Sequence, residues 1–339
     1  MPSPFPNSHH TIRGTTICHQ LSSLALKDNY WNDPHIRDLW VHLPHGFLVE
    51  QTYPLLIILP AFAGTGEGLL ARSLTDVALT HRIDSWIAKE ICPPFITVFP
   101  DVMTYLGGSQ FVDSPAIGNY AQYITQDVIS FVQERYPISN IAVMGHSSGG
   151  YGAIKLAMQH PNLFCAVACH AGDMGFSSAY SSDLLPALLA IHQAGSPRAF
   201  LSAFWNKRHF SGADFSAFNI LCMSAAYAPN PNNSEFPADL PFDYHKGIID
   251  FESFQTWTQH DPLVLIQEET NRRGLSSLNS LYIECGNQDE YLLQFGARRF
   301  VEKLSHHNIE HIYAEFEGGH RGGSLRFEHS IPQLIHACS

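Results

Sequence analysis

Short apolar segments alternate with amphipathic segments along most of the chain. Residues 11–21 and 35–43 carry alternating apolar positions, a pattern typical of β-strands, and are predicted to form an opening antiparallel pair. The second strand is expected to carry Leu39, Val41 and Leu43 on one face and Trp40 and His42 on the other.

Continuous apolar runs predict strands that are covered on both faces, as in parallel sheets. Such runs lie at residues 53–60, 95–99, 141–145, 163–170, 280–285 and 309–316. Segments with helical spacing accompany them, at residues 73–90, 120–136, 151–159, 261–271, 290–307 and 324–336. The alternation of strand and helix predicts an α/β protein with a mostly parallel central sheet.

The alternation stops in one long segment. Residues 173–258 contain Leu-rich helical pieces at 184–194 and 197–205 instead of further strands. Because the regular order resumes afterwards, the sequence predicts one α/β domain formed by residues 1–172 and 259–339. The intervening segment is expected to be a helical lid inserted into that domain.

Composition and charge narrow the range of partners. The 339 residues carry a formal net charge of −12. Lys and Arg form no run longer than two residues, so we expect no patch that binds nucleic acid or an anionic membrane. No apolar run approaches the roughly 18 residues of a membrane span, and residues 1–10 lack the apolar core of a signal peptide. The oligomeric state is left open, with a homodimer as one alternative.

The cysteines and histidines point to the compartment and to the absence of a metal. Seven cysteines are present, and no Cys-x-x-Cys pair occurs. Their odd number and their place in apolar runs favour free buried thiols in a reducing compartment, and hence a cytoplasmic protein. The 20 histidines include no His-Glu-x-x-His motif, so no metal site is predicted.

The most informative stretch is residues 141–153, where an apolar run ends in Gly145-x-Ser147-x-Gly149 and a helix follows. This order is typical of a nucleophile elbow, a strained turn that holds a serine hydroxyl clear of the sheet. The two glycines would let two backbones pass close together where a side chain would block them. Ser147 is therefore the predicted nucleophile, and a simple glycine-rich turn is the alternative.

A nucleophilic serine needs a base, and the base needs an orienting carboxylate. In sheets of this type such groups follow the carboxyl ends of strands. Asp289 follows the strand predicted at 280–285, and His320 follows the strand predicted at 309–316. The chain order Ser147, Asp289, His320 is the one expected of an α/β-hydrolase triad.

Other interpretations of these residues stay open. Asp261 is a rival acid, but Pro262 follows it, and a helix cap explains such an Asp better. Glu290 is a second rival, one position away, and Asp289 could merely cap the next helix. His320 could be a surface histidine, although the two glycines before it favour a specialised loop.

The oxyanion formed during acyl transfer needs two preorganised hydrogen-bond donors. One is expected to be the backbone N–H of Ser148, directly after the nucleophile. The other is expected from the loop after the strand at 53–60, with Phe62 as first choice and Ala61 or Ala63 as alternatives.

A family resemblance is carried by residues 39–46, 53–59, 107–115, 118–120, 145–150, 285–289 and 319–320. In these segments the chain resembles the Putative esterase family of α/β-hydrolases, which includes esterase D, enterochelin esterases, feruloyl esterases and mycolyltransferases. The resemblance implies an eight-stranded sheet and serine-dependent hydrolysis of esters or thioesters without a cofactor.

In the family, the residue two positions after an Asp-Gly or His-Gly pair supplies the second oxyanion N–H; Phe62 holds that position here. The chain departs from the family by carrying Pro60-Ala61 in place of that pair and by its long insertion.

Together these features predict an α/β-hydrolase that cleaves a small-molecule carboxylic ester. Ser147 would attack the acyl carbonyl, His320 would act as general base, and Asp289 would orient it. The lid is expected to wall an apolar acyl or alkyl pocket, with Trp205 and Tyr151 as candidate lining residues. An acyltransferase or thioesterase with the same triad is the nearest alternative, and a catalytically silent ligand-binding scaffold is an alternative of another class.

Overall fold

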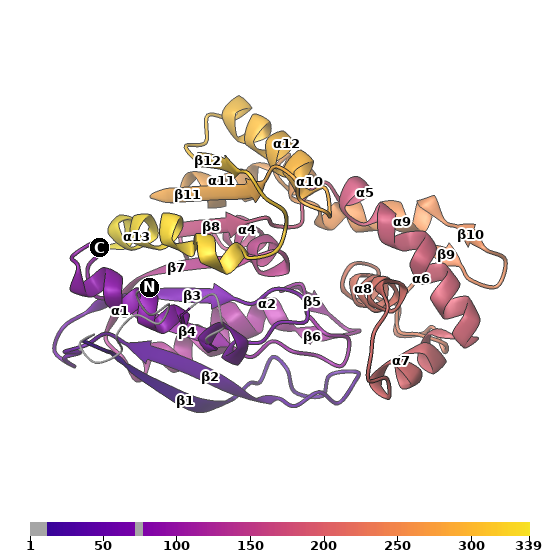
Figure 1. Ribbon diagram of the computed structural model, residues 1–339, viewed down its shortest axis with the longest axis horizontal. Coiled ribbons are helices and arrows are strands. Elements are labelled where there is room, and N and C mark those ends of the chain that lie inside the picture. Colours follow the sequence, from indigo (N-terminus) through magenta and orange to yellow (C-terminus); the bar gives the residue numbers. More distant parts are fainter. Residues whose placement is uncertain (1–11, 72–76) are drawn as a thin grey trace, which may run out of the picture.

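The centre of the molecule is an eight-stranded twisted sheet with helices on both faces (Figure 1). The computed structural model describes residues 12–71 and 77–339. The strands of the sheet are β1 (Thr15–Ser22), β2 (Ile36–Leu43), β3 (Tyr53–Leu59), β4 (Ile96–Pro100), β7 (Ile138–His146), β8 (Ala166–His170), β11 (Ser280–Gly286) and β12 (Ile312–Phe316). Their order is β1-β2-β4-β3-β7-β8-β11-β12, and neighbours are parallel from β4 onward. Among the described residues of this sheet, only the β1–β2 and β2–β4 pairs are antiparallel. The predictions of a mostly parallel sheet and of an opening antiparallel pair are therefore confirmed.

The middle strands are apolar throughout because both faces of the sheet are covered. In β3, Leu55, Ile57 and Leu59 belong to the larger cluster of buried apolar residues, while Leu56 and Ile58 belong to a second cluster on the opposite face. Successive side chains of a strand point to opposite faces, so a strand between two helical layers needs an apolar residue at every position.

Two helices cover the face of the second cluster, and the remaining helices of the sheet region cover the first. The second cluster includes buried residues of α1 (Leu79–Ala88) and α13 (Phe327–Cys338). The helices over the first face are α2 (Tyr120–Gln122), the π-helical η2 (Tyr123–Val128), α3 (Ile129–Gln133), α4 (Ser148–Gln159), α10 (Pro262–Leu265), α11 (Glu269–Ser276) and α12 (Leu293–His306). Three short 3₁₀ segments, η1 (Glu67–Leu70), η3 (Thr258–His260) and η4 (Gly323–Arg326), and a small two-stranded ladder of β5 (Asp113–Ser114) and β6 (Gly118–Asn119) lie in connections.

The predicted elements of the sheet region are confirmed, with shifted ends. The helix expected at 73–90 corresponds to α1, and the residues from 73 to 76 lie outside the described part of the chain. The helix expected at 261–271 is divided into α10 and α11, and the one expected at 120–136 contains the π-helical η2 in its middle.

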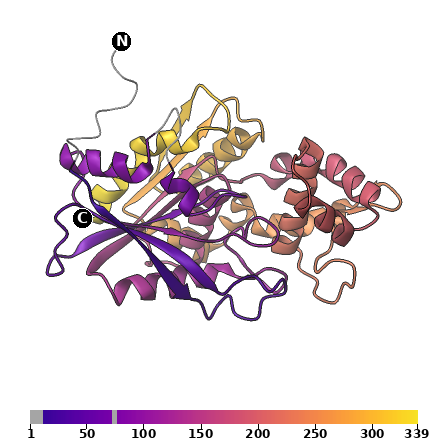
Figure 2. The ribbon, with the colours of Figure 1, turned by 60° about the horizontal axis from the view of Figure 1, so that its bottom comes forward.

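Residues 173–258 form a group of helices set beside the sheet, as both views show (Figures 1 and 2). The group contains α5 (Phe176–Ala179), α6 (Ser181–Ala194), α7 (Pro197–Trp205), α8 (Gly212–Tyr227), α9 (Phe251–Trp257) and the ladder of β9 (Phe242–Asp243) and β10 (Ile248–Ile249). The helical pieces predicted at 184–194 and 197–205 match α6 and α7. We call residues 173–258 the lid segment; its division from the rest of the chain as a separate unit stays a prediction.

Helix α8 is the one long element that hydrophobic periodicity missed. It lies between the other lid helices and the sheet region. From Ala217 to Tyr227 every residue except the half-buried Asn219 is buried, so this part of the helix has no polar stripe. A local signal was present at its start. Ser211 and Asp214 form a capping box, in which each side chain accepts a hydrogen bond from the other residue's backbone N–H.

The prediction of free thiols is wrong for two cysteines. Cys165, directly before β8, and Cys338, at the end of α13, form a disulfide across a sequence separation of 173 residues. The other five cysteines are free; Cys18 is exposed and the remaining four are buried. Sequence spacing could not reveal this pair, because packing of α13 against β8 brings the two residues together. Within the described residues, no helix is both long and apolar enough to cross a membrane.

Candidate active site

The turn between β7 and α4 has the geometry of a nucleophile elbow. Ser147 occupies it with φ 57° and ψ −125°, a strained conformation for a residue with a side chain. A Cβ on Gly145 would lie 2.4 Å from the backbone of Gly149, and one on Gly149 would lie 2.2 Å from the carbonyl oxygen of Leu59. Glycine is therefore required at both positions, since the first turn of α4 packs directly against the ends of β7 and β3.

Ser147, His320 and Asp289 meet at the carboxyl edge of the sheet, although 173 residues separate the first two. Ser147 Oγ lies 2.9 Å from His320 Nε2, and His320 Nδ1 lies 2.7 Å from Asp289 Oδ2. Each follows the end of a different strand, namely β7, β12 and β11. With Nδ1 donating to the carboxylate, Nε2 is left free to accept the serine proton.

The two acids at 289 and 290 hold the same histidine in different ways. Asp289 is buried, and its second oxygen accepts a hydrogen bond from the backbone N–H of Tyr291 at 2.9 Å. Glu290 accepts the backbone N–H of His320 at 2.7 Å and so fixes the main chain rather than the ring. The rival Asp261 caps α10 by accepting from Leu263 N–H, as its sequence context predicts.

The candidate oxyanion donors come from two segments, the start of α4 and the loop after β3. Ser148 begins α4, where the first backbone N–H groups have no partner within the helix. On the opposite side, the N–H of Ala63 donates to Gly107 O at 2.8 Å and is therefore occupied. Phe62 and Ala61, the other two choices, both line the pocket in front of Ser147.

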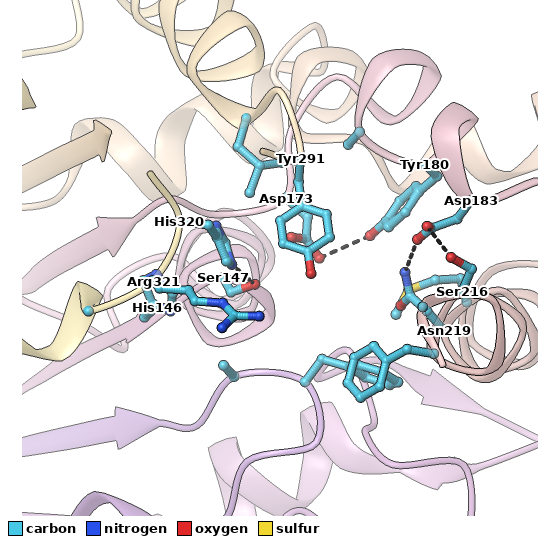
Figure 3. A pocket seen from close by; sticks show the side chains of 18 residues that line it. His146, Ser147, Asp173, Tyr180, Asp183, Ser216, Asn219, Tyr291, His320 and Arg321 are labelled. Atoms are coloured by element: carbon cyan, nitrogen blue, oxygen red, sulfur yellow. Dashed lines mark hydrogen bonds between the residues drawn. The ribbon is translucent and has the colours of Figure 1, made fainter. Parts of the chain in front are cut away.

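A pocket of about 630 Å³ opens in front of Ser147 and is closed on its far side by the lid segment (Figure 3). Phe62 and Phe215 form an apolar wall, with their rings 5.9 Å apart. The other wall is polar. It includes Asp173 and Asp183, and Asp183 accepts hydrogen bonds from two residues of α8, Ser216 and Asn219. The expected all-apolar pocket is therefore corrected to one with an apolar and a polar side.

The structure does not bring the two predicted lining residues, Trp205 and Tyr151, to this pocket. Trp205 ends α7 and is half-exposed, and its ring contacts Tyr105, 5.7 Å away between centroids. Tyr151 is fully buried beneath the elbow, and its hydroxyl donates to His260 O at 3.1 Å. Tyr151 is only four residues from Ser147, but its ring packs in the core against Phe176 and Tyr227.

Several pocket residues escaped the sequence analysis, Asp173 above all. It follows β8, so the rule that selected Asp289 applies to it as well. It accepts hydrogen bonds from Gln110 and Tyr180 instead of approaching His320. Burial raises the pKa of Asp173, the hydrogen bonds from Tyr180 and Gln110 acting in the opposite direction.

His146 lies against the candidate base, with 4.6 Å between the centroids of its ring and that of His320. Burial, together with the neighbouring His320 and His170, lowers the pKa of His146 to about 3. The side chain is therefore neutral near neutral pH, and it adds no positive charge that would oppose protonation of His320.

A second serine–histidine–carboxylate set lies away from the pocket. Ser330 Oγ is 2.8 Å from His170 Nε2, and His170 Nδ1 is 3.6 Å from Glu284. Arg326 binds both oxygens of Glu284, at 2.8 and 3.0 Å, and the partners lower the pKa of Glu284 to about 2 despite its burial. Ser330, His170 and Glu284 are all buried, so no substrate carbonyl can reach this serine.

Comparison with known proteins identifies the family. The family model described as Putative esterase matches residues 35–334, which is most of the chain. The chain belongs to the Putative esterase family. This membership confirms the resemblance noted in its sequence motifs.

Individual relatives agree with the family and the fold. Cutinase est1 from Thermobifida alba is 30% identical over 121 residues, and the aligned part spans 35% of this chain and 35% of the cutinase. A ferulic acid esterase structure superposes with a TM-score of 0.60 at 16% identity, covering 97% of this chain and 100% of the other. The structure of an S-formylglutathione hydrolase from Agrobacterium tumefaciens superposes with a TM-score of 0.59 at 14% identity, covering 97% of this chain and 98% of the other. The two structures show the α/β-hydrolase fold for this member of the Putative esterase family.

Proposed function

We propose that the protein is a serine esterase that forms an acyl-enzyme on Ser147. The observation that supports this most directly is the hydrogen-bonded chain from Ser147 through His320 to Asp289, which opens on the pocket beside the lid segment. His320 takes the proton of Ser147 as Ser147 Oγ attacks the acyl carbonyl. Asp289 stabilises the imidazolium of His320 that results.

The remaining steps use the same groups. The N–H groups of Ser148 and Phe62 receive the oxyanion of the tetrahedral intermediate. His320 returns its proton to the leaving alcohol, which breaks the ester bond and leaves the acyl group on Ser147. His320 then removes a proton from water, the hydroxide oxygen attacks the acyl carbonyl, and Ser147 leaves with the proton from His320.

The pocket supports a small ester as substrate. Its volume of about 630 Å³ is in the range typical of small-molecule sites. The lining combines the apolar rings of Phe62 and Phe215 with the carboxylates of Asp173 and Asp183, so the site suits an ester with both an apolar and a polar part.

The proposed location depends on the redox state of one cysteine pair. Free cysteines favour the cytoplasm, whereas the Cys165–Cys338 disulfide is typical of oxidising compartments. Alkylation of free thiols in the native host, followed by mass spectrometry, distinguishes the cytoplasm from an oxidising compartment. Free thiols at Cys165 and Cys338 would support the cytoplasm, and a disulfide between them would exclude it. The homodimer also stays a prediction, which the mass of the particle in solution would decide.

The test of the mechanism is Ser147→Ala, which should lower kcat for p-nitrophenyl acetate by roughly 10³- to 10⁶-fold without unfolding the protein. Ser330→Ala is the matched control, because Ser330 also lies 2.8 Å from a histidine but is buried. A fluorophosphonate should add to Ser147 in the wild type and in the control. Full activity of Ser147→Ala, or an adduct at another residue, would refute the proposal.

A further inference from the structure

The loop between β4 and β5 contains an unusual run of strained residues beside the elbow. Gly107, Gln110 and Phe111 have φ angles of 85°, 50° and 52°. The last two carry side chains, and consecutive left-handed residues of this kind persist only where surrounding contacts hold them. We call residues 107–111 the brace loop.

Gln110 is the residue of this loop with the most polar contacts, and its side chain is fully buried. Its Oε1 accepts a hydrogen bond from the hydroxyl of Ser148, the residue directly after the nucleophile. Its Nε2 donates to Asp173 Oδ2 at 3.1 Å and lies 3.3 Å from the hydroxyl of Tyr180 and 2.9 Å from the sulfur of Met223. One amide therefore connects the start of α4 to three residues that line the pocket.

The brace loop also holds the opposite side of the site. The carbonyl oxygen of Gly107 accepts the N–H of Ala63, at 2.8 Å, directly after Phe62. A Cβ on Gly108 would lie 2.8 Å from the ring of Phe62, so that glycine allows the ring to pack on the loop. The same five residues thus contact both segments that carry the candidate oxyanion donors, Ser148 and Phe62.

We propose that Gln110 is a positioning residue for the esterase reaction, which acts by fixing Ser148 and Asp173 relative to each other. This inference rests on the proposed function of Ser147. Oxyanion donors accelerate acyl transfer only when they are already oriented toward the developing charge. The hydroxyl of Ser148 donates to Gln110, so a buried hydrogen bond outside the helix holds the residue that carries the candidate donor.

The direct test is Gln110→Leu, which keeps the approximate volume and removes both polar ends. With p-nitrophenyl acetate, kcat should fall about 10- to 100-fold while KM changes little, because the loss is in transition-state stabilisation. Asn271→Leu is the matched control. Asn271, in α11 and outside the pocket, is also a buried amide and donates to Leu265 O at 2.8 Å; its loss should lower Tm but leave kcat unchanged.

A double-mutant cycle tests whether Gln110 acts through Ser148. Ser148→Ala removes the hydroxyl and keeps the backbone N–H, so it should reproduce part of the kcat loss. The effects of Gln110→Leu and Ser148→Ala should be less than multiplicative when combined, because both break one contact. Multiplicative losses would overturn the proposal.

Gln110→Glu supplies a pH-dependent readout and serves if Gln110→Leu does not fold. A protonated Glu can still accept from Ser148 and donate to Asp173, whereas its ionised form cannot donate. The ratio of variant to wild-type kcat should therefore fall as pH rises, and a ratio that is constant with pH would overturn the proposal. The role of Gln110 would be rejected if Gln110→Leu had a normal kcat. The proposed function would remain intact in that case if the fluorophosphonate still labelled the wild-type enzyme at Ser147.

Discussion

At the scale of residues, Asp289 and Glu290 show how neighbouring carboxylates divide two tasks. The first contacts the ring of His320 at Nδ1, and the second accepts the backbone N–H of the same residue. A Cβ on Gly319 would lie 2.7 Å from the carboxylate of Glu290, so the glycine before the histidine lets this contact form. The sequence left both acids as candidates, and their contacts explain why: both bind His320, one at the ring and one at the backbone N–H.

These contacts predict unequal effects of two matched substitutions. Asp289→Asn should lower kcat roughly 10⁴-fold, because the amide favours the wrong tautomer of His320 and cannot stabilise the imidazolium. Glu290→Gln keeps an acceptor oxygen for the backbone of His320, so its loss should stay below about 10-fold. Steady-state kinetics of both variants at one pH checks this. A larger effect of Glu290→Gln than of Asp289→Asn would reverse the assignment of the acid.

At the scale of elements, the pocket depends on the pairing of α6 with α8. Asp183 in the first turn of α6 receives hydrogen bonds from Ser216 and Asn219 on α8, at 2.7 and 2.9 Å. That pairing places Phe215 of α8 opposite Phe62, on the loop after β3. The apolar wall is therefore shared between the lid segment and the sheet region, and either can change it.

Truncation of this wall should affect binding more than chemistry. Phe215→Ala removes a ring that is 41% exposed and lines the pocket, which should cost about 1 kcal/mol of apolar contact, or roughly fivefold in KM, for p-nitrophenyl butyrate. Phe251→Ala, on α9, is the control: Phe251 is 72% exposed and does not line this pocket. A KM change of the same size in both variants would show that the effect is not due to the pocket.

At the scale of the whole molecule, the disulfide and the active site lie at opposite ends of the parallel strands. Cys165 precedes the amino end of β8, whereas the elbow and the triad follow the carboxyl ends of their strands. The disulfide ties the last helix, α13, to the middle of the sheet. It should therefore contribute to stability without contacting the reacting groups.

Removal of the disulfide should lower the free energy of unfolding by about 2–4 kcal/mol, since it closes a long loop of the unfolded chain. Urea unfolding of Cys338→Ser against wild type measures this, and Cys18→Ser is the control because Cys18 is free and exposed. Activity at 25 °C should be unchanged in both variants. Equal stability of Cys338→Ser and wild type would mean that the disulfide does not form or does not constrain the chain.

The second set of Ser330, His170 and Glu284 shows why composition alone does not define a site. Its residue types repeat those of a catalytic triad, yet all three side chains are buried, while Ser147 faces a pocket of about 630 Å³. The difference is access, which depends on how the lid segment and the loops after the strands pack.

The sequence by itself determined the order along the chain of the strands of the central sheet and of the helices between them, and the three residues that meet at the edge of the sheet. Apolar runs fix buried strands, Gly145 and Gly149 mark the elbow, and Asp289 and His320 lie three and four residues after a strand. These are local patterns, and in a parallel sheet the residues that follow strands necessarily gather at one edge.

Only the tertiary structure decided which residues line the pocket, how Gln110 contacts Ser148, and that Cys165 pairs with Cys338. Helix α8 belongs here too, because most of its residues are buried and its sequence therefore lacks a polar stripe. Each of these features depends on contacts between segments far apart in the chain. Hydrophobic periodicity records which face of an element is buried, but not which distant segment covers it.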